Sequence, residues 1–159
     1  MTEIRRIRVS EVEHVADLWA EYAAELADPS EGLTDEARLR VIEHLRANAS
    51  HPDAACLVAV VGDEVVGFAT AATFTHPTLG GILGEIEEIY VHPDHRRRGV
   101  GTTIASAILD WLDVHGGNVM KVRIGRGLGQ RTAIAFWEAM GFESDMVECS
   151  LYPHAQRVR

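Results

Sequence analysis

Hydrophobic residues near the start of the chain follow strand and then helical periodicity. The alternating segment IRRIRV, residues 4–9, predicts a strand. The next segment predicts an amphipathic helix, because it carries an apolar stripe at helical spacing made of Val12, Val15, Trp19, Tyr22 and Leu26. Ser10 and Glu13 have the spacing of a capping box, which would satisfy free backbone N–H groups at the start of this helix.

The pattern then changes from helical to β-rich. A second helix is expected to begin at Thr34 and to turn Leu39, Ile42 and Leu45 toward the core. Two β-rich runs flank the turn residues 62–64 and predict a hairpin. After a loop rich in Gly and Pro, the segment ILGEIEEIYV predicts a further strand.

The last third of the chain alternates helices with strands. Apolar residues at helical spacing predict a helix near residue 102 that buries Ile104, Ile108, Trp111 and Leu112. His115 and Gly116 are typical of its C-terminal end. A strand over residues 118–124, a helix over 130–140 and a final strand over 145–152 complete the expected order.

This order predicts the fold class. Antiparallel pairs come first and a β-α-β crossover follows, so we expect a single α/β domain over residues 1–159. The sheet should be mixed, with helices on both faces and with the strand before Arg96 parallel to the strand at 118–124. A crevice at the carboxyl ends of such parallel strands is a common ligand site.

Composition and charge narrow the function. The 159 residues are 47% hydrophobic and carry a net charge of −9, which argues against general nucleic-acid binding and favours cationic substrates. No apolar run is long enough to cross a membrane and no secretory signal is evident, so a cytoplasmic protein is expected. Cys56 and Cys149 lie far apart in apolar contexts, where buried, reduced thiols are expected.

The segment VHPDHRRRGVGTTI, residues 91–104, places three arginines directly before the helix that starts near residue 102. The first N–H groups of a helix have no partner inside it, and the helix dipole adds partial positive charge there. Gly99 and Gly101 lack side chains, so a bulky anion can approach the backbone closely. These features predict a diphosphate site, with a solvated basic turn as the alternative.

The segments EIEEIYVHPDHRRRGVGTTIASAIL and QRTAIAFWEAMGF resemble the GNAT superfamily of acetyl-CoA-dependent N-acetyltransferases. The resemblance implies a mostly antiparallel sheet with one splayed parallel pair, and acetyl-CoA as cosubstrate in the gap. It implies that Val91 offers its backbone to the pantetheine arm. Gln130 stands where many members have an Asn, and its amide can still reach the cofactor by hydrogen bond. The residues implied to bind the pyrophosphate are Arg96, Arg97, Arg98, Gly99, Val100, Gly101 and Thr102. Homodimers are common among similar proteins.

Three carboxylates precede this motif, and the reaction needs a base to deprotonate the acceptor amine. On a regular strand Glu85 and Glu87 share one face and Glu88 the other, whereas a bulge, frequent in the family here, would change that alternation. The resemblance to polyamine-acetylating members favours Glu87 as base, with Glu88 second. The carboxylates could equally hold a cationic substrate or blunt a sheet edge.

The sequence departs from the family where many members have a Tyr that protonates the leaving thiolate. Trp137 stands there, and an indole N–H cannot act as that acid. Either Tyr90 replaces it, or the thiolate leaves unprotonated. His92 and His95 lack further ligands nearby, so no metal site is expected.

The expected function is acetyl transfer to the primary amine of a small cationic molecule, without a nucleic-acid or membrane partner. The alternatives are acetylation of a protein or peptide N-terminus, and a non-catalytic acyl-CoA sensor, which the Trp at position 137 favours.

Overall fold

A computed structural model describes residues 1–26, 33–78, 81–125 and 129–145. The strands are β1 (Thr2–Arg6), β2 (Ala54–Val61), β3 (Glu64–His76), β4 (Gly81–Val91) and β5 (Val119–Val122). The helices are α1 (Val12–Leu26), α2 (Asp35–Asn48), α3 (Val100–Val114) and α4 (Gln130–Ala139). The strand expected at 145–152, and Cys149 with it, falls almost wholly outside the described residues.

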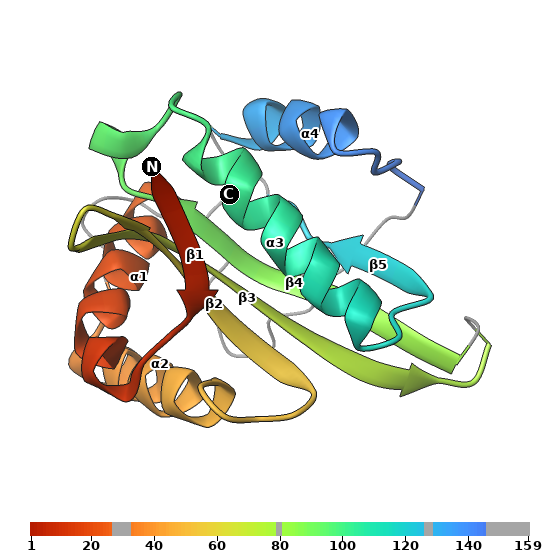
Figure 1. Cartoon of the computed structure of the whole chain (residues 1–159), viewed down its shortest axis with the longest axis horizontal. Helices are drawn as coiled ribbons and strands as arrows, with labels where there is room; N and C mark the ends of the chain where they lie inside the picture. Colours follow the sequence, from red (N-terminus) through yellow and green to blue (C-terminus); the bar gives the residue numbers. More distant parts are fainter. Residues whose placement is uncertain (27–32, 79–80, 126–128, 146–159) are drawn as a thin grey trace, which may run out of the picture.

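The strands form one sheet in the order β1-β2-β3-β4-β5, as Figure 1 shows. Every neighbouring pair is antiparallel except β4 and β5, which run parallel across the α3 crossover. The mixed α/β fold class and the parallel pair expected from the sequence are therefore confirmed. The hairpin is also confirmed, because Val61 faces Glu64 across a turn in which Gly62 has a φ of 64°.

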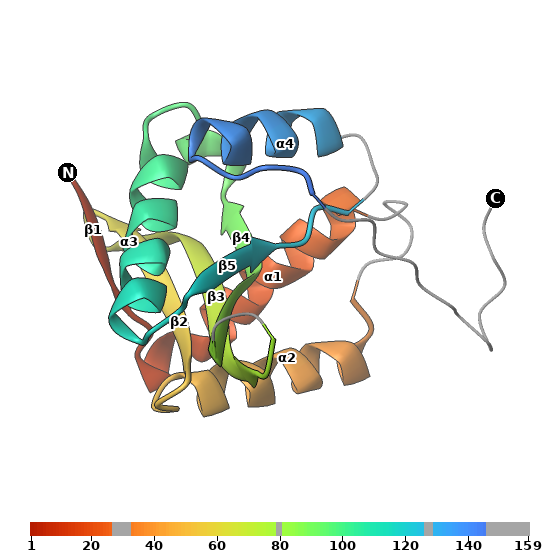
Figure 2. The same ribbon diagram turned by 90° about the vertical axis from the view of Figure 1, so that its right-hand side faces the viewer.

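Helices cover both faces of the sheet, with α1 and α2 on one side and α3 on the other (Figure 2). A hydrophobic core lies on each face of the sheet, and the side chains of β2 alternate between the two cores. Cys56, Val58 and Val60 pack with α1 and α2, whereas Ala55, Leu57 and Ala59 pack with α3. A strand covered on both faces reads as a continuous apolar run, which explains the sequence AACLVAVV.

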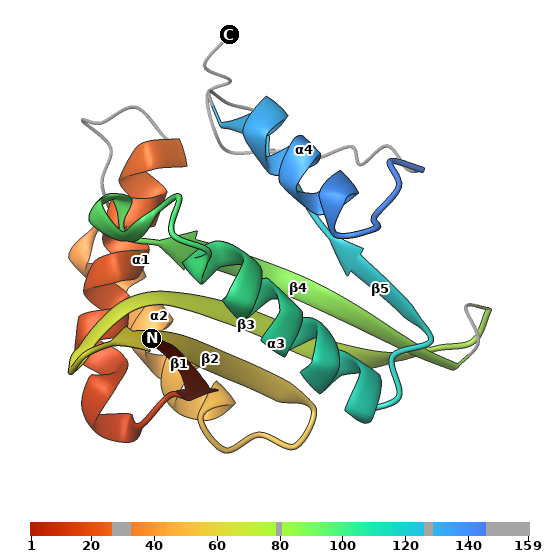
Figure 3. The same cartoon turned by 45° about the horizontal axis from the view of Figure 1, so that its top comes forward.

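The parallel pair is short. Leu83 to Ile86 of β4 pair with Val119 to Val122 of β5, and the ladder ends there. Beyond this point the two strands diverge toward their carboxyl ends (Figure 3). The splayed pair implied by the family resemblance is therefore present.

Two local expectations were wrong. The capping box of Ser10 and Glu13 does not form, because a 3-10 turn over Val9–Glu11 comes first and Glu11 accepts the Arg8 N–H at 2.8 Å. Leu26 and Leu39 are 55% and 60% exposed instead of facing the core. The reason is that α1 packs on the sheet through its first half and α2 through its second half. The Thr34 cap is confirmed, since its hydroxyl accepts the Ala37 N–H at 3.1 Å.

Candidate functional site

A β-bulge in β4 arranges the acidic side chains of this strand. Thr70 of β3 faces Glu88, whereas Ala71 faces Ile86, so Glu87 is the extra residue. Ile86 and Ile89 both lie in the core under α3. The two residues between them therefore share the opposite face, toward α1 and α2. The bulge that the family resemblance suggested does change the alternation of the strand.

These two carboxylates line a pocket of about 670 Å³. It opens where β4 and β5 diverge, because Arg123 and Gly125, just after β5, also line it. The remaining walls come from the second half of α1, from Leu33 just before α2, and from α2 as far as His44. Their lining residues are Trp19, Tyr22, Leu26, Leu33, Ala37, Arg40, Val41 and His44. Aromatic rings and carboxylates together suit a cationic group.

Glu87 pairs with a histidine that the sequence analysis did not single out. His44 Nε2 lies 3.5 Å from Glu87 Oε2, a distance that fits an ion pair better than a well-formed hydrogen bond. The same nitrogen lies 3.1 Å from Nδ2 of the buried Asn48. Its partner Glu87 raises the pKa of His44, against the opposing effect of burial. No local motif marks His44, because α2 and β4 meet only through the fold.

Glu88 is the second half-buried carboxylate of the pocket. Burial raises its pKa, and the hydrogen bond with the Tyr22 hydroxyl partly opposes that effect. Burial, followed by the bond to Glu88, raises the pKa of Tyr22. A carboxyl with a raised pKa in a pocket is a candidate for proton transfer as well as for binding a cation.

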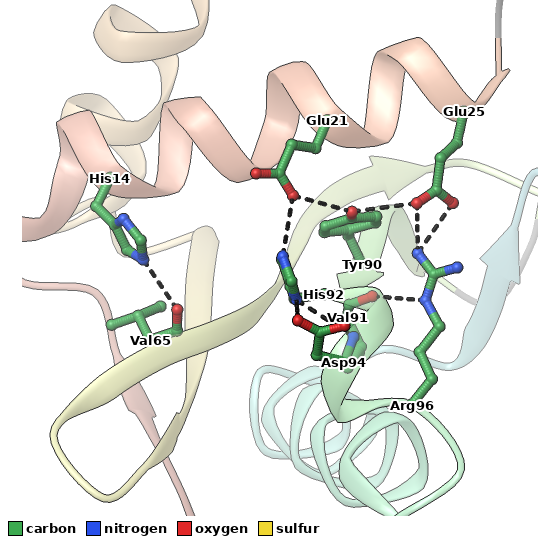
Figure 4. A network of polar contacts seen from close by, with 9 residues as sticks. All are labelled: His14, Glu21, Glu25, Val65, Tyr90, Val91, His92, Asp94 and Arg96. Atoms are coloured by element: carbon green, nitrogen blue, oxygen red, sulfur yellow. Dashed lines mark hydrogen bonds and ion pairs between the residues drawn. The ribbon is translucent and has the colours of Figure 1, made fainter.

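The Tyr90 hydroxyl is held by two carboxylates of α1. It donates to Glu21 at 3.3 Å and to Glu25 at 3.2 Å (Figure 4). Burial, and then the charges of Glu25 and Glu21, raise the pKa of Tyr90. His92 lies 3.7 Å from Glu21 in the same network.

The side chain of Arg96 points toward α1, into this network (Figure 4). Its Nη2 donates to both oxygens of Glu25 at 2.7 and 2.9 Å, and its guanidinium lies 5.3 Å from the centroid of the Tyr90 ring. Its Nε donates to the Val91 carbonyl at 2.7 Å. Arg96 therefore links the end of β4 to α1, and a pyrophosphate-binding role for this side chain stays a prediction.

The backbone of Val91 points away from β3. The His92 N–H donates to the Val66 carbonyl at 2.8 Å while Val91 faces Gly67, so Val91 and Gly67 form a non-hydrogen-bonded pair. In such a pair the N–H and C=O of Val91 point to the other side of the strand. That side is where β5 has diverged, so the edge of β4 is open to a ligand that can mimic a strand.

The turn that follows Val91 runs directly into the start of α3. Arg97 has a φ of 61° and Gly99 a φ of 82°, both in the left-handed region. Gly99 is the N-cap residue and offers no side-chain cap, so the first N–H groups of α3 remain available. A turn of this kind forms a concave array of N–H groups that suits an anion.

The side chains of this loop differ in exposure. Arg97 and Arg98 are exposed and form no ion pair within the part of the chain that the structure describes. Thr102 is also exposed, whereas the side chain of Val100 is buried in the core under α3. Only the backbone of Val100 can therefore serve a ligand. Gly101 lies beside Val91 and Phe136, whose side chains would be 4.0 Å from a Cβ at this position.

Helix α4 carries Trp137 and Gln130, the two positions at which the sequence departs from the family pattern. Trp137 is buried, with Phe136 and Phe142 each 5.1 Å away between ring centroids, so it packs in the core. Gln130 is the first residue of α4 and is half-buried. Its amide forms no side-chain hydrogen bond within the described residues, and a contact with a cofactor stays a prediction.

The described residues contain neither a candidate metal site nor a helix that could span a membrane. No group of three His, Cys, Asp or Glu side chains within them is arranged to hold a metal ion. None of the described helices is long and apolar enough to span a membrane.

Comparison with known proteins gives a consistent picture. Residues 15–142 match the model of the acetyltransferase (GNAT) family. A mycothiol acetyltransferase of Parafrankia sp. (strain EAN1pec) is 39% identical over 106 residues, which cover 66% of this chain and 29% of that protein. The chain spans less than a third of the length of the curated relatives it matches.

Solved structures share the fold at low sequence identity. An aminoglycoside N-acetyltransferase, AAC(6')-Iy, in complex with CoA has a TM-score of 0.75 and 20% identity, over 98% of this chain and 96% of that one. A ribosomal-protein-alanine N-acetyltransferase from Brucella melitensis biovar Abortus 2308 has a TM-score of 0.73 and 19% identity, over 96% and 99% of the chains.

Proposed function

Because this chain belongs to the GNAT acetyltransferase family, we propose that it transfers the acetyl group of acetyl-CoA to the primary amine of a small cationic molecule. The observation that carries the proposal is the position of the acidic aromatic pocket. It opens at the point where β4 leaves β5, on the same stretch of β4 that ends at the outward-facing backbone of Val91.

The cofactor side of the proposal depends mainly on backbone groups. The turn from Arg97 to Gly101 and the first N–H groups of α3 would bind the pyrophosphate, helped by the charges of Arg97 and Arg98. Val91 would bind the pantetheine arm through its N–H and C=O, once Arg96 releases the carbonyl. Gln130, at the start of α4, would reach the same cofactor by hydrogen bond.

The acceptor side depends on side chains. Glu87 and Glu88 would attract the ammonium group, while the rings of Trp19 and Tyr22 would hold it by cation–π contact. Arg123 and Arg40 also line the pocket, but each is paired with a glutamate, Glu85 at 2.5 Å and Glu36 at 2.9 Å. The carboxylates of β4 therefore dominate the charge available to an acceptor.

The chemistry follows from this placement. An alkyl ammonium has a pKa of about 10, so a proton must leave it before its nitrogen can attack. Glu87 takes that proton, and the freed lone pair forms a C–N bond with the thioester carbonyl carbon. The C–S bond then breaks, its electron pair leaves with sulfur, and the second proton passes from the nitrogen to solvent water as the amide forms.

The leaving thiolate needs no dedicated acid in this proposal. The Tyr90 hydroxyl already donates to Glu21 and Glu25, and their charges, with burial, raise its pKa. A thiol has a pKa of about 8.5, so its thiolate is a fair leaving group without protonation. Protonation by Tyr90 is the alternative that the sequence analysis left open.

Two other functions compete with this proposal. The names of the curated relatives favour a small-molecule acceptor, whereas acetylation of a peptide N-terminus would require the pocket to admit a chain. A non-catalytic acyl-CoA sensor would bind the cofactor through the same backbone groups without using Glu87.

A panel assay separates these functions. We expect acetyl-CoA to raise the melting temperature, because a ligand that binds only the folded state stabilises it. We then expect CoA thiol release with polyamines or aminoglycosides and none with neutral peptides. Protection by acetyl-CoA without thiol release from any amine would favour the sensor, and release with peptides alone would favour the second function.

A further inference from the structure

His44 contacts the proposed base from a helix that carries no part of the cofactor site. Its Nε2 faces the inner oxygen of Glu87, and that oxygen is shielded from solvent and has no hydrogen bond within the described residues. The His44 ring also meets the edge of Trp19 at 5.9 Å between centroids. The imidazole is therefore packed against the pocket wall and held toward Glu87.

We propose that His44 is a positioning residue that shares with Glu87 the proton taken from the acceptor, so that the pair is the base. This inference rests on the proposed acetyl transfer. In it, the ammonium proton passes to Glu87 and is then shared with His44 Nε2, while the amine nitrogen keeps the lone pair that forms the new C–N bond. No electrons move at His44, and the shared proton returns to solvent after the amide has formed.

The proton affinities favour a pair over a lone carboxylate. A free carboxyl group has a pKa of about 4.3 and a free imidazole one of about 6.5, against about 10 for the ammonium. The imidazole is therefore the better match for the proton to be removed. Glu87 raises the pKa of His44 further, which narrows the pKa difference between the imidazole and the ammonium group.

Asn48 lies beside the same nitrogen of His44. Its Nδ2 is 3.1 Å from His44 Nε2, and its side chain is buried. Nε2 has a single lone pair in the ring plane, so Asn48 Nδ2 can donate to it only while Nε2 is unprotonated. When Nε2 carries the shared proton, the Asn48 amide must present Oδ1 instead, and the Nε2–H then donates to Glu87 or to Asn48.

The other charged groups around His44 are consistent with a raised pKa of its imidazole. Glu88 from β4 favours the imidazolium, as Glu87 does. Arg40, on the same helix as His44, and Arg123, beyond β5, are each paired with a glutamate of their own. Tyr22 from α1 is bonded to Glu88, and its raised pKa keeps it neutral.

The pH profile of His44→Gln tests the inference. Wild-type kcat/KM should rise with pH through an apparent pKa above 6.5, because the pair must lose its proton first. His44→Gln should lose this step between about pH 6 and 8 and should lower kcat roughly tenfold. The control His76→Gln, at the far end of β3, should keep both the pH step and the wild-type kcat. The same step at the same pH in His44→Gln would overturn the inference.

Imidazole titration by NMR gives a readout that needs no turnover. His44, assigned by its absence from the spectrum of His44→Gln, should titrate above pH 6.5 in the wild type and at lower pH in Glu87→Gln. An unchanged titration in Glu87→Gln would contradict the pair even if acetyl transfer is observed. A coupled titration in a protein that transfers no acetyl group to any amine would instead contradict the proposed function.

Discussion

The proposed cofactor side and the proposed acceptor side of this site are built in different ways. The cofactor side is one continuous segment, from Val91 through the arginine turn to the start of α3, and it offers mainly backbone groups. The acceptor side gathers side chains from α1, α2, β4 and the end of β5. A backbone site leaves a local sequence pattern, because it needs glycines and a helix start at fixed spacing, whereas a side-chain site leaves none.

The two sides also differ in how they relate to the core. One face of α3 is buried along the whole helix, with Val100, Ile104, Ile108 and Leu112 in the core, so the start of the helix is fixed by packing. The pocket walls instead combine side chains that also contact the sheet, such as Trp19 on Phe68 and His44 on Glu87, with the exposed Leu26. The acceptor side is therefore only partly tied to the core.

Gly101→Trp should have the largest effect, and only on the cofactor side. A Cβ at this position would lie 4.0 Å from Val91 and Phe136, so a methyl group fits but an indole would cover the backbone of the turn. We expect loss of the thermal protection by acetyl-CoA, measured as the shift in melting temperature. Gly101→Ala is the matched control and should keep most of that shift. Unchanged affinity in Gly101→Trp would move the cofactor away from this turn.

Glu87→Gln should have the next largest effect, on the acceptor side alone. The substitution removes the base but keeps the shape, so turnover at neutral pH should fall on the order of 100-fold. The loss should narrow at high pH, where free amine becomes abundant. The measurement is kcat for wild type and variant across pH 6.5–9.5. A ratio that stays flat over this range would rule out Glu87 as the base.

The sequence predicted the local structure of the proposed cofactor side, and for physical reasons. The turn, the helix start and the parallel crossover are local features, and the structure has all three. What it could not predict was the direction of Arg96, because the acidic partner Glu25 lies 71 residues earlier on another helix. Three adjacent arginines look alike in sequence, yet one of them is held by α1.

The acceptor side was only half predictable. Glu87 and Glu88 were visible in the strand, but their shared face depends on a bulge, and His44 depends on the docking of α2. The two wrong core assignments, Leu26 and Leu39, fall in the free halves of α1 and α2. Leu26 lines the pocket, whereas Leu39 does not, so an apolar stripe that continues past the core contacts of its helix is not by itself a marker of the pocket.

Glu25→Gln should sharpen the comparison, because the Glu25–Arg96 pair is the contact that joins α1 to the cofactor turn. Both side chains are about 40% exposed, so the pair should contribute at most about 1 kcal/mol, and the melting temperature should fall by a few degrees. We also expect KM for acetyl-CoA to fall several-fold, because Arg96 without its Glu25 partner would release the Val91 carbonyl to the cofactor more readily.

A matched control for this variant is available on the same helix. Glu13→Gln removes one of the two α1 carboxylates paired with Arg38 of α2, at 3.0 Å, while Asp17 keeps its own pair at 2.7 Å, and Arg96 is not touched. It should cost a similar small amount of stability and leave KM for acetyl-CoA unchanged. If both variants change that KM equally, α1 acts only as a structural support and the specific link through Arg96 is wrong.

Tyr22→Phe should have the smallest effect, and it should depend on pH. Burial already raises the pKa of Glu88, and the Tyr22 hydroxyl partly opposes this by stabilising the charged form. Removing the hydroxyl should therefore raise the pKa of Glu88 further. Glu88 would then be protonated over a wider range of mildly acidic pH, and its attraction for an ammonium group would weaken there. We expect KM for the amine to rise a few-fold at pH 6 and less at pH 8, with kcat unchanged. The same rise at both pH values would mean that Tyr22 acts through the shape of the pocket, because only a change in the charge of Glu88 can disappear as the pH rises.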